Sequence, residues 1–154
     1  MRLYTFTNMY LSQIQRGIQS AHVASDLLVK YSVHNGIEKR NTLFDWAGNH
    51  KTMIVLNGGY SSTLHVLIDL FDDPRNPHPF AAFYESEDAL AGALTCVGIV
   101  LPERIYETAS LIRQDPTVLS VINDTGELVS DKIHWTFNSW EAKLLPELNN
   151  YSLA

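Results

Sequence analysis

One run of eight residues, 94–101, is apolar at almost every position and constrains the fold more than any other stretch of the chain. It is far shorter than the roughly 18 apolar residues that a membrane-spanning helix needs. A short, nearly continuous apolar run is typical of a strand that lies inside a sheet and is covered on both faces. The sequence therefore predicts a sheet with 94–101 near its centre.

Other predicted strands and helices alternate along the first 113 residues. Strand patterns fall near residues 2–8, 52–56 and 80–85, and helical patterns follow them from Leu11, from Ser61 or Ser62, and from Pro102. The longest helix reaches about Tyr31, and its apolar residues recur at helical spacing. These are Leu11, Ile14, Ile18, Ala21, Ala24 and Leu28. Such alternation predicts the α/β class, as a small mixed sheet with helices on both faces.

The last third of the chain follows a different pattern. Two β-rich segments, 118–122 and 127–129, flank Asn123-Asp124-Thr125-Gly126, which predicts a hairpin. A short helix is expected over 140–148, and Asn35-Gly36 earlier in the chain marks a turn. We expect residues 1–102 to form the core and 103–154 to be a C-terminal extension packed on the same domain.

Charge and cysteine content narrow the functional classes. The 17 acidic residues outnumber the 11 basic ones, giving a formal net charge of −6. A broad nucleic-acid surface is usually basic, so this balance disfavours one. Cys96 is the single cysteine, which excludes an intramolecular disulfide and suits a reducing compartment. With no apolar run long enough for a signal peptide or a membrane span, a cytoplasmic location without membrane contact is expected.

Four polar residues of the first helix share one face because they are spaced by four, three and four positions. They are Gln15, Gln19, His22 and Asp26. In the functional interpretation, His22 is a general acid or base, Gln19 contacts the substrate, and Asp26 orients the imidazole ring. The alternative is an ordinary solvated face with an incidental histidine, and composition alone favours that alternative.

Metal and cofactor chemistry find little support in the sequence. The six histidines show no tight ligand spacing, so no zinc site is expected. The acidic run of Glu85, Glu87 and Asp88 could bind Mg²⁺ or Mn²⁺, but an acidic turn that begins a helix explains it better. Cys96 fits a buried small residue better than a nucleophile. No metal or cofactor is predicted.

Several short motifs, taken in order, resemble type 2 peptidyl-tRNA hydrolases. The segment Gln19-Ser20-Ala21-His22-Val23-Ala24 is similar to the Gln-Cys-Ser-His-Ala-Ala segment of that family. Trp46 precedes a strand led by Lys51, as the family's tryptophan precedes a lysine-led strand. Glu85, Gly92 and Thr95 then precede an apolar strand that ends at Pro102. The resemblance covers about residues 1–102.

The resemblance implies a set of site residues. It places His22, Glu85 and Thr95 in catalytic roles, and it places Gln15, Arg16, Gln19 and Gly92 against the ligand. The chain also departs from the family pattern. The family's Asp-Ala-Gly-Arg-Thr stretch is replaced by Glu85-Ser86-Glu87-Asp88-Ala89, which removes an arginine and adds negative charge.

Three functions follow as hypotheses. The first is a diverged, phage-type member that binds and hydrolyses a small nucleotide, such as a cyclic-nucleotide immune signal, because a small ligand does not need the missing basic surface. The second is a genuine peptidyl-tRNA hydrolase acting on the ester at the tRNA 3′ end. The third is a non-catalytic module that binds a nucleotide or a protein. The resemblance also implies a possible homodimer.

Overall fold

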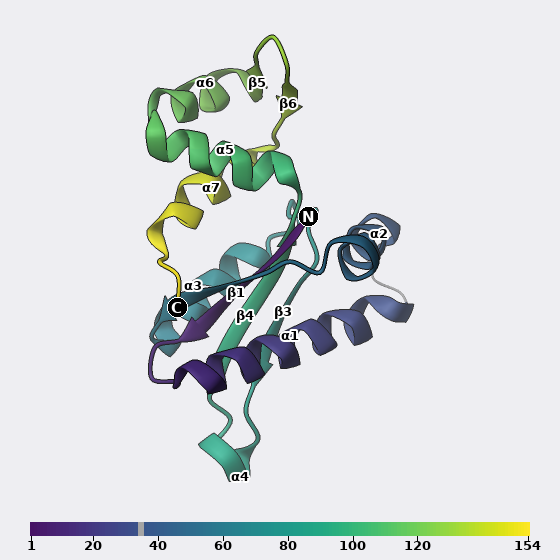
Figure 1. The fold of residues 1–154 in the computed structure, drawn as a ribbon, viewed down its shortest axis with the longest axis vertical. Coiled ribbons are helices and arrows are strands. Elements are labelled where there is room, and N and C mark those ends of the chain that lie inside the picture. The colour runs from purple at the N-terminus through teal and green to yellow at the C-terminus, as the bar shows by residue number, and fades with distance from the viewer. Residues whose placement is uncertain (34–35) are drawn as a thin grey trace.

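The computed structural model describes residues 1–33 and 36–154 and contains a four-stranded sheet between two layers of helices (Figure 1). The strand order is β2-β1-β4-β3. The strands are β1 (Arg2–Asn8), β2 (Met53–Gly59), β3 (Phe80–Tyr84) and β4 (Leu94–Leu101). β1 pairs parallel with β2 and antiparallel with β4, and β3 pairs antiparallel with β4. The predicted α/β class and mixed sheet are confirmed at this level.

Strand β4 lies inside the sheet, as its apolar sequence predicts. All eight of its residues are buried, and β1 and β3 flank it. At Gly98 a helix lies close to the strand, because a Cβ atom there would lie 2.5 Å from Val23 Cγ1. Glycine at this position therefore lets the first helix pack directly on the sheet.

One face of the sheet is covered by α1 (Gln13–Val33), α2 (Ile37–Asp45) and a single π-helical turn, η1 (Trp46–His50). Residues from the sheet and from these helices form one apolar cluster. Its buried members are Leu3, Val23, Leu27, Tyr31, Leu43, Trp46, Ala81, Cys96 and Val100. The turn predicted at Asn35-Gly36 rests partly on Asn35, which lies outside the described residues.

Helix α1 presents a different face to the sheet from the one its apolar spacing predicts. Its buried residues are Gln19, Ser20, Val23, Leu27 and Tyr31. Ile14 and Ile18 are instead 78% and 49% exposed, so the predicted stripe was wrong there. Polar Ser20 is tolerated inside because its hydroxyl lies 2.8 Å from Thr5 Oγ1 and donates to the Arg16 carbonyl oxygen.

The opposite face is covered by α3 (Ser61–Phe71), and the C-terminal third packs against it from beyond the end of the sheet where β4 ends (Figure 1). That third contains α5 (Glu103–Gln114), α6 (Thr117–Thr125), β5 (Glu127–Val129), β6 (His134–Thr136), α7 (Ser139–Glu147) and η2 (Leu148–Asn150). Phe6 and Ile99 of the sheet share a buried cluster with Ile105 and Trp140 of these helices. The chain end then pairs with the outer edge of β2, where Asn57 N–H donates to the Ser152 carbonyl oxygen at 2.9 Å.

The hairpin predicted around Asn123–Gly126 was wrong in its first arm. Residues 117–125 form α6, and the hairpin is built from β5 and β6 further along. The β-branched Val118 and Ile122 favour a strand locally. They are four positions apart, however, and both pack against the helical layer, so tertiary burial overrides that preference. Gly126, at φ 73°, ends the helix.

A polar triad of buried His78 and Glu141 with half-buried Arg104 joins the C-terminal third to the sheet. His78, before β3, and Glu141, on α7, are only 4% and 2% exposed, and their Nε2 and Oε1 atoms lie 2.8 Å apart. Arg104 of α5 donates to the same carboxylate oxygen. The other carboxylate oxygen of Glu141 accepts the Asn138 backbone N–H at 3.0 Å and completes a capping box.

We expect this triad to make the protein acid-sensitive. Burial lowers the pKa of His78 below its ordinary 6.5 despite the nearby carboxylate. Burial would raise the pKa of Glu141, but hydrogen bonds from His78 and Arg104 outweigh that effect and hold it at about 2, against 4.5 normally. At both positions the unfolded chain binds a proton at a higher pH than the folded chain does. The free energy of unfolding therefore decreases as pH drops below 6.5, through His78, and decreases again below 4.5, through Glu141.

Urea unfolding midpoints between pH 7.5 and 4.5 would measure this effect. The midpoint should drop across the interval, and His78→Gln should flatten the drop because it removes the histidine titration. A wild-type midpoint that stays constant from pH 7.5 to 4.5 would contradict the expectation.

Candidate functional site

The candidate site lies at one end of the sheet, which we call the carboxyl edge. Because β1 and β2 are parallel and β3 also runs in their direction, all three strands end there and β4 begins there. Helices α1 and α3 both start at this edge, directly after β1 and β2. In open α/β sheets, ligands bind outside the carboxyl ends of the strands.

Asn8 fixes the geometry of this edge from its position at the end of β1. Its side-chain amide donates to Ser61 Oγ at 3.0 Å and to the Leu94 carbonyl oxygen at 3.4 Å. Its Oδ1 accepts the Tyr10 backbone N–H at 3.2 Å. One buried side chain therefore links the ends of β1 and β4 with the first turn of α3.

Gln15 and Arg16 stabilise the junction between β1 and α1. Gln15 Oε1 accepts the Ser12 backbone N–H at 2.9 Å, and Ser12 Oγ accepts the Gln15 N–H at 3.3 Å, which is a capping box. Arg16 donates to the Leu11 and Met9 carbonyl oxygens, both at 3.1 Å. Both side chains thus hold the backbone, and their predicted contact with a ligand remains a prediction.

Buried Gln19 and half-buried Glu85 form the inner part of the site. Gln19 is 5% exposed, and its Nε2 donates to Glu85 Oε1. Gln19 Oε1 is also buried and accepts no hydrogen bond in the described structure. A buried acceptor without a partner is costly, which favours a ligand or water that donates to it.

His22 lies on the exposed side of this pair. Its ring stacks on Phe83, with centroids 4.5 Å apart and planes inclined by 8°. Thr95 approaches from β4, where its hydroxyl donates to the Phe83 carbonyl oxygen at 3.4 Å. Asp26 forms no hydrogen bond with His22 in the described part of the chain, so the predicted orienting role falls to Phe83 instead.

Gly92 shapes the connection between β3 and β4, which carries α4 (Glu87–Leu90) and projects beyond the sheet (Figure 1). Its φ is 69°, and a Cβ atom would lie 2.9 Å from Glu87 Oε1. Ser86 caps α4 by accepting the Ala89 N–H at 3.3 Å, so the acidic run begins a helix as expected. The structure gives Gly92 a turn-forming role, and its predicted contact with a ligand remains a prediction.

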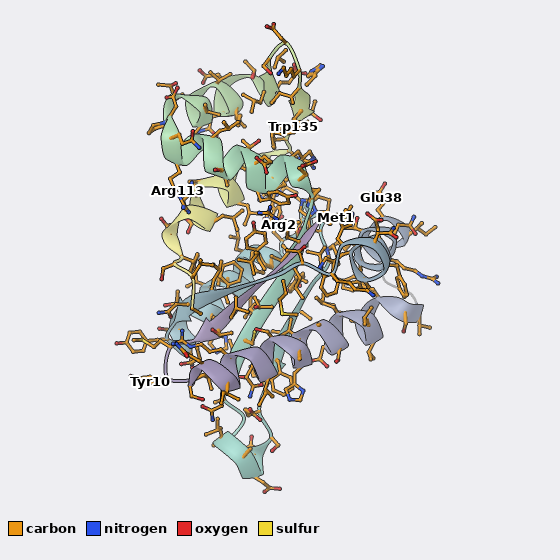
Figure 2. All side chains as sticks on the ribbon, viewed as in Figure 1. Met1, Arg2, Tyr10, Glu38, Arg113 and Trp135 are labelled. Atoms are coloured by element: carbon orange, nitrogen blue, oxygen red, sulfur yellow. The ribbon has the colours of Figure 1, made fainter. Side chains whose placement is uncertain are left out.

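Exposed aromatic residues border the carboxyl edge. Tyr10 and Tyr60 are 78% and 53% exposed, and their rings lie 5.6 Å apart in an edge-on arrangement. Figure 2 shows Tyr10 pointing away from the body of the protein. Sequence patterns missed both tyrosines and Phe83. The only available signal was that Tyr10 and Tyr60 follow the ends of two predicted strands.

Other chemistry is not supported at this edge. Among the described residues, no group of three or more histidine, cysteine or acidic side chains is arranged to hold a metal ion. Burial raises the pKa of the Cys96 thiol to about 12, so Cys96 is not a nucleophile at neutral pH. No helix in the described ranges is long and apolar enough to cross a membrane.

The structure therefore gathers Gln19, His22, Glu85 and Thr95 around Phe83 and assigns Gln15, Arg16 and Gly92 to the surrounding backbone. No protein-family model matches the chain, and no curated protein matches it. Function is consequently inferred from the residues of the carboxyl edge.

Proposed function

We propose that the protein binds a small nucleotide at the carboxyl edge and hydrolyses one of its phosphate esters, with His22 moving the proton. The observation that carries the proposal is the His22–Phe83 stack beside the hydrogen bond between buried Gln19 and half-buried Glu85. Stacking holds an exposed imidazole in one orientation, and the half-buried Glu85 carboxylate is bonded to a buried amide, that of Gln19, whose oxygen lacks a partner. An ordered histidine and a carboxylate gathered at the edge where ligands bind favour acid–base catalysis.

The polar groups present favour a ligand that donates hydrogen bonds. Gln19 Oε1 is an acceptor without a partner, and Glu85 adds carboxylate oxygens, so sugar hydroxyls, base amino groups or a reactive water would fit. Tyr10 and Tyr60 offer aromatic surface to a base. The first turns of α1 and α3 offer backbone amides to a single phosphate.

The charges at the carboxyl edge favour a small ligand over RNA. Glu85, Glu87 and Asp88 place negative charge at the edge, and Arg16 is bonded to the backbone. A long polyanion gains its affinity from many basic contacts, which this edge lacks. A single phosphate can be bound by the backbone amides at the start of a helix and needs fewer basic side chains than RNA does. A peptidyl-tRNA ester remains the alternative substrate and is one outcome of the test below.

The proposed step needs no co-reactant besides water. His22 takes a proton from the water as its oxygen bonds to phosphorus, and the bond from phosphorus to the leaving oxygen breaks. The leaving oxygen takes up a proton from solvent, and His22 later releases its own proton to solvent. Glu85, held by Gln19, positions the water, and Thr95 supports Phe83 beneath the imidazole. General-base catalysis of this kind contributes about 10²–10⁴-fold to the rate.

Purified protein should be incubated with linear and cyclic nucleotides and with a peptidyl-tRNA, and the products separated by chromatography. We expect one nucleotide to be consumed, and His22→Ala to slow this by about 100-fold or more while binding persists. His134→Ala is the matched control, because His134 is an exposed histidine on the distant β6.

Each other outcome contradicts the proposal in a defined way. Turnover of peptidyl-tRNA alone would assign the ester hydrolase activity instead. Recovery of an intact bound ligand, with no turnover, would assign a binding module. Equal loss of rate in His22→Ala and His134→Ala would remove His22 from the reaction.

A further inference from the structure

A cavity of about 370 Å³ lies away from the carboxyl edge, between the first halves of β1 and β2 and one side of α5. Its remaining wall is the segment 148–153, where the chain end pairs with the outer edge of β2. None of the candidate site residues lines this cavity. Small-molecule sites usually have volumes of about 300–1,000 Å³, so the cavity has room for a small ligand.

Two arginines stand at opposite ends of the cavity. The guanidinium of Arg2 lies over the ring of Tyr106 on α5, 3.9 Å from the ring centroid. Arg113 is roughly two turns further along the same helix, a rise of about 10 Å. Figure 2 shows Arg2 near the start of α5 and Arg113 near its other end. A ligand in the cavity therefore meets a positive charge at each end.

Both arginines are held by neutral groups. Arg2 is half-buried and donates to the Tyr4 hydroxyl oxygen. Arg113 Nε donates to Asn149 Oδ1 at 3.2 Å. Within residues 1–33 and 36–154, neither arginine forms an ion pair, and no acidic side chain lines the cavity. Since a guanidinium carries several N–H donors, each arginine retains donors for an anionic ligand.

The rest of the lining is largely apolar and aromatic. Burial raises the pKa of Tyr4 and of Tyr106, so their hydroxyls stay neutral at neutral pH. Glu103 and Glu107 lie near Tyr106 on α5 but outside the lining. The apolar members of the lining are Ile54, Leu56, Ala109, Leu148 and Leu153. Such walls favour a ligand with an apolar body over a free inorganic ion.

We propose that this cavity is a second binding site, for a small elongated molecule that carries an anionic group at each end and an apolar body between them. Arg2 binds one anionic group and Arg113 binds the other. Guanidinium groups bind carboxylate and phosphate in the same forked geometry, so either anion satisfies the site. The wall 148–153 is held to β2 by backbone hydrogen bonds, so an occupied cavity should also stabilise this segment.

Isothermal titration calorimetry with biphenyl-4,4′-dicarboxylate tests the proposal, because this ligand places carboxylates at both ends of a rigid apolar body. Biphenyl-4-carboxylate is the matched ligand with one anion. It should bind about tenfold more weakly or worse, because it leaves one arginine without an anion. Equal affinities for the two ligands, or no binding of the dicarboxylate at about 1 mM, overturn the proposal. Biphenyl-4,4′-bisphosphonate then distinguishes the two anions, since the tighter ligand assigns phosphate or carboxylate.

Arg113→Gln tests the contact at one end of the cavity. Arg113 is exposed, so the substitution should leave folding intact. We expect dicarboxylate binding to weaken about tenfold or more, so that its advantage over biphenyl-4-carboxylate disappears. Arg40→Gln is the matched control, because Arg40 is exposed on α2, across the sheet, and also lies over an aromatic ring, that of Phe44. Dicarboxylate affinity that Arg113→Gln leaves unchanged contradicts the proposed contact.

An added carboxylate gives an independent check. Ser110 is an exposed lining residue of α5 between Tyr106 and Arg113, so Ser110→Glu should compete with the ligand for the arginines and weaken binding about tenfold or more. Ser120→Glu is the control, because Ser120 is exposed on α6 outside the lining. Wild-type affinity in Ser110→Glu would place the ligand elsewhere.

Hydrogen–deuterium exchange locates the ligand without any substitution. With the dicarboxylate bound, we expect slower exchange in residues 148–154 and unchanged exchange in residues 80–92, which lie at the carboxyl edge. Protection of 80–92 alone would place the ligand at the candidate site and overturn the second site. The dicarboxylate is not a phosphate ester and none of these measurements depends on turnover, so they separate this site from the proposed reaction.

Discussion

Replacing Glu141 with alanine is expected to destabilise the protein by about 3–5 kcal/mol, the usual effect of removing one partner from a buried ion pair. The loss arises because buried His78 and half-buried Arg104 would keep their positions without the carboxylate that both contact. The capping box of α7 would lose its glutamate as well. For a chain of this size, the melting temperature should fall by roughly 10 °C.

Thermal unfolding and urea titration would measure this change. Glu141→Gln separates charge from shape, because glutamine can still complete the capping box, and it should be destabilised less than the alanine variant. Glu107→Ala is the control, since Glu107 is exposed on α5, and it should shift stability by no more than about 0.5 kcal/mol. A melting temperature for Glu141→Ala within 2 °C of wild type, a margin of about 1 kcal/mol, would show that the triad contributes little.

Replacing Trp140 with alanine should also cost about 3–5 kcal/mol. Its side chain is fully buried in the cluster that includes Phe6 and Ile99 of the sheet. Its indole N–H donates to the Leu70 carbonyl oxygen at 2.7 Å, so the substitution also leaves that α3 oxygen without this donor. Because one cluster spans both parts of the chain, the C-terminal third and the sheet should lose stability together.

Tryptophan fluorescence can follow the sheet by itself. The chain has three tryptophans, so Trp135→Phe combined with Trp140→Ala leaves only Trp46, which is buried against the far face of the sheet. Compared with Trp135→Phe alone, the double variant should unfold at lower urea by both fluorescence and circular dichroism. If Trp46 fluorescence kept the midpoint of the Trp135→Phe reference while circular dichroism shifted, residues 103–154 would be an independent unit.

Much of the fold was predictable because local patterns and tertiary packing agree over residues 1–113. The continuous apolar run at 94–101 became a fully buried strand, and the helices after β1 and β2 begin close to their predicted starts. Agreement failed at α6, where Val118 and Ile122 favour a strand locally but pack as a helix. Local propensity is the weaker effect wherever a different conformation buries more apolar surface.

The candidate site was only partly predictable. Spacing on one helix was enough to place His22 and Gln19 near each other, and the resemblance added Glu85 and Thr95. Phe83 could not be found in this way. Nothing in the sequence distinguishes a strand phenylalanine that stacks on a histidine from one that packs in the core. The capping role of Gln15 could have been found from the Ser-x-x-Gln pattern at Ser12.

The sequence by itself determined the α/β class, the central strand and the histidine-bearing helix, because periodicity and apolar runs are local properties. Tertiary structure decided which face of α1 is buried. Periodicity favours Ile14, Ile18 and Ala21 as the core stripe, yet Ser20 and Val23 face the sheet. Gly98 makes close packing beneath Val23 possible, and Thr5 satisfies the Ser20 hydroxyl. Both partners are distant in sequence, so no helical pattern alone could reveal that this face fits the sheet and that Ile14 and Ile18 stay exposed.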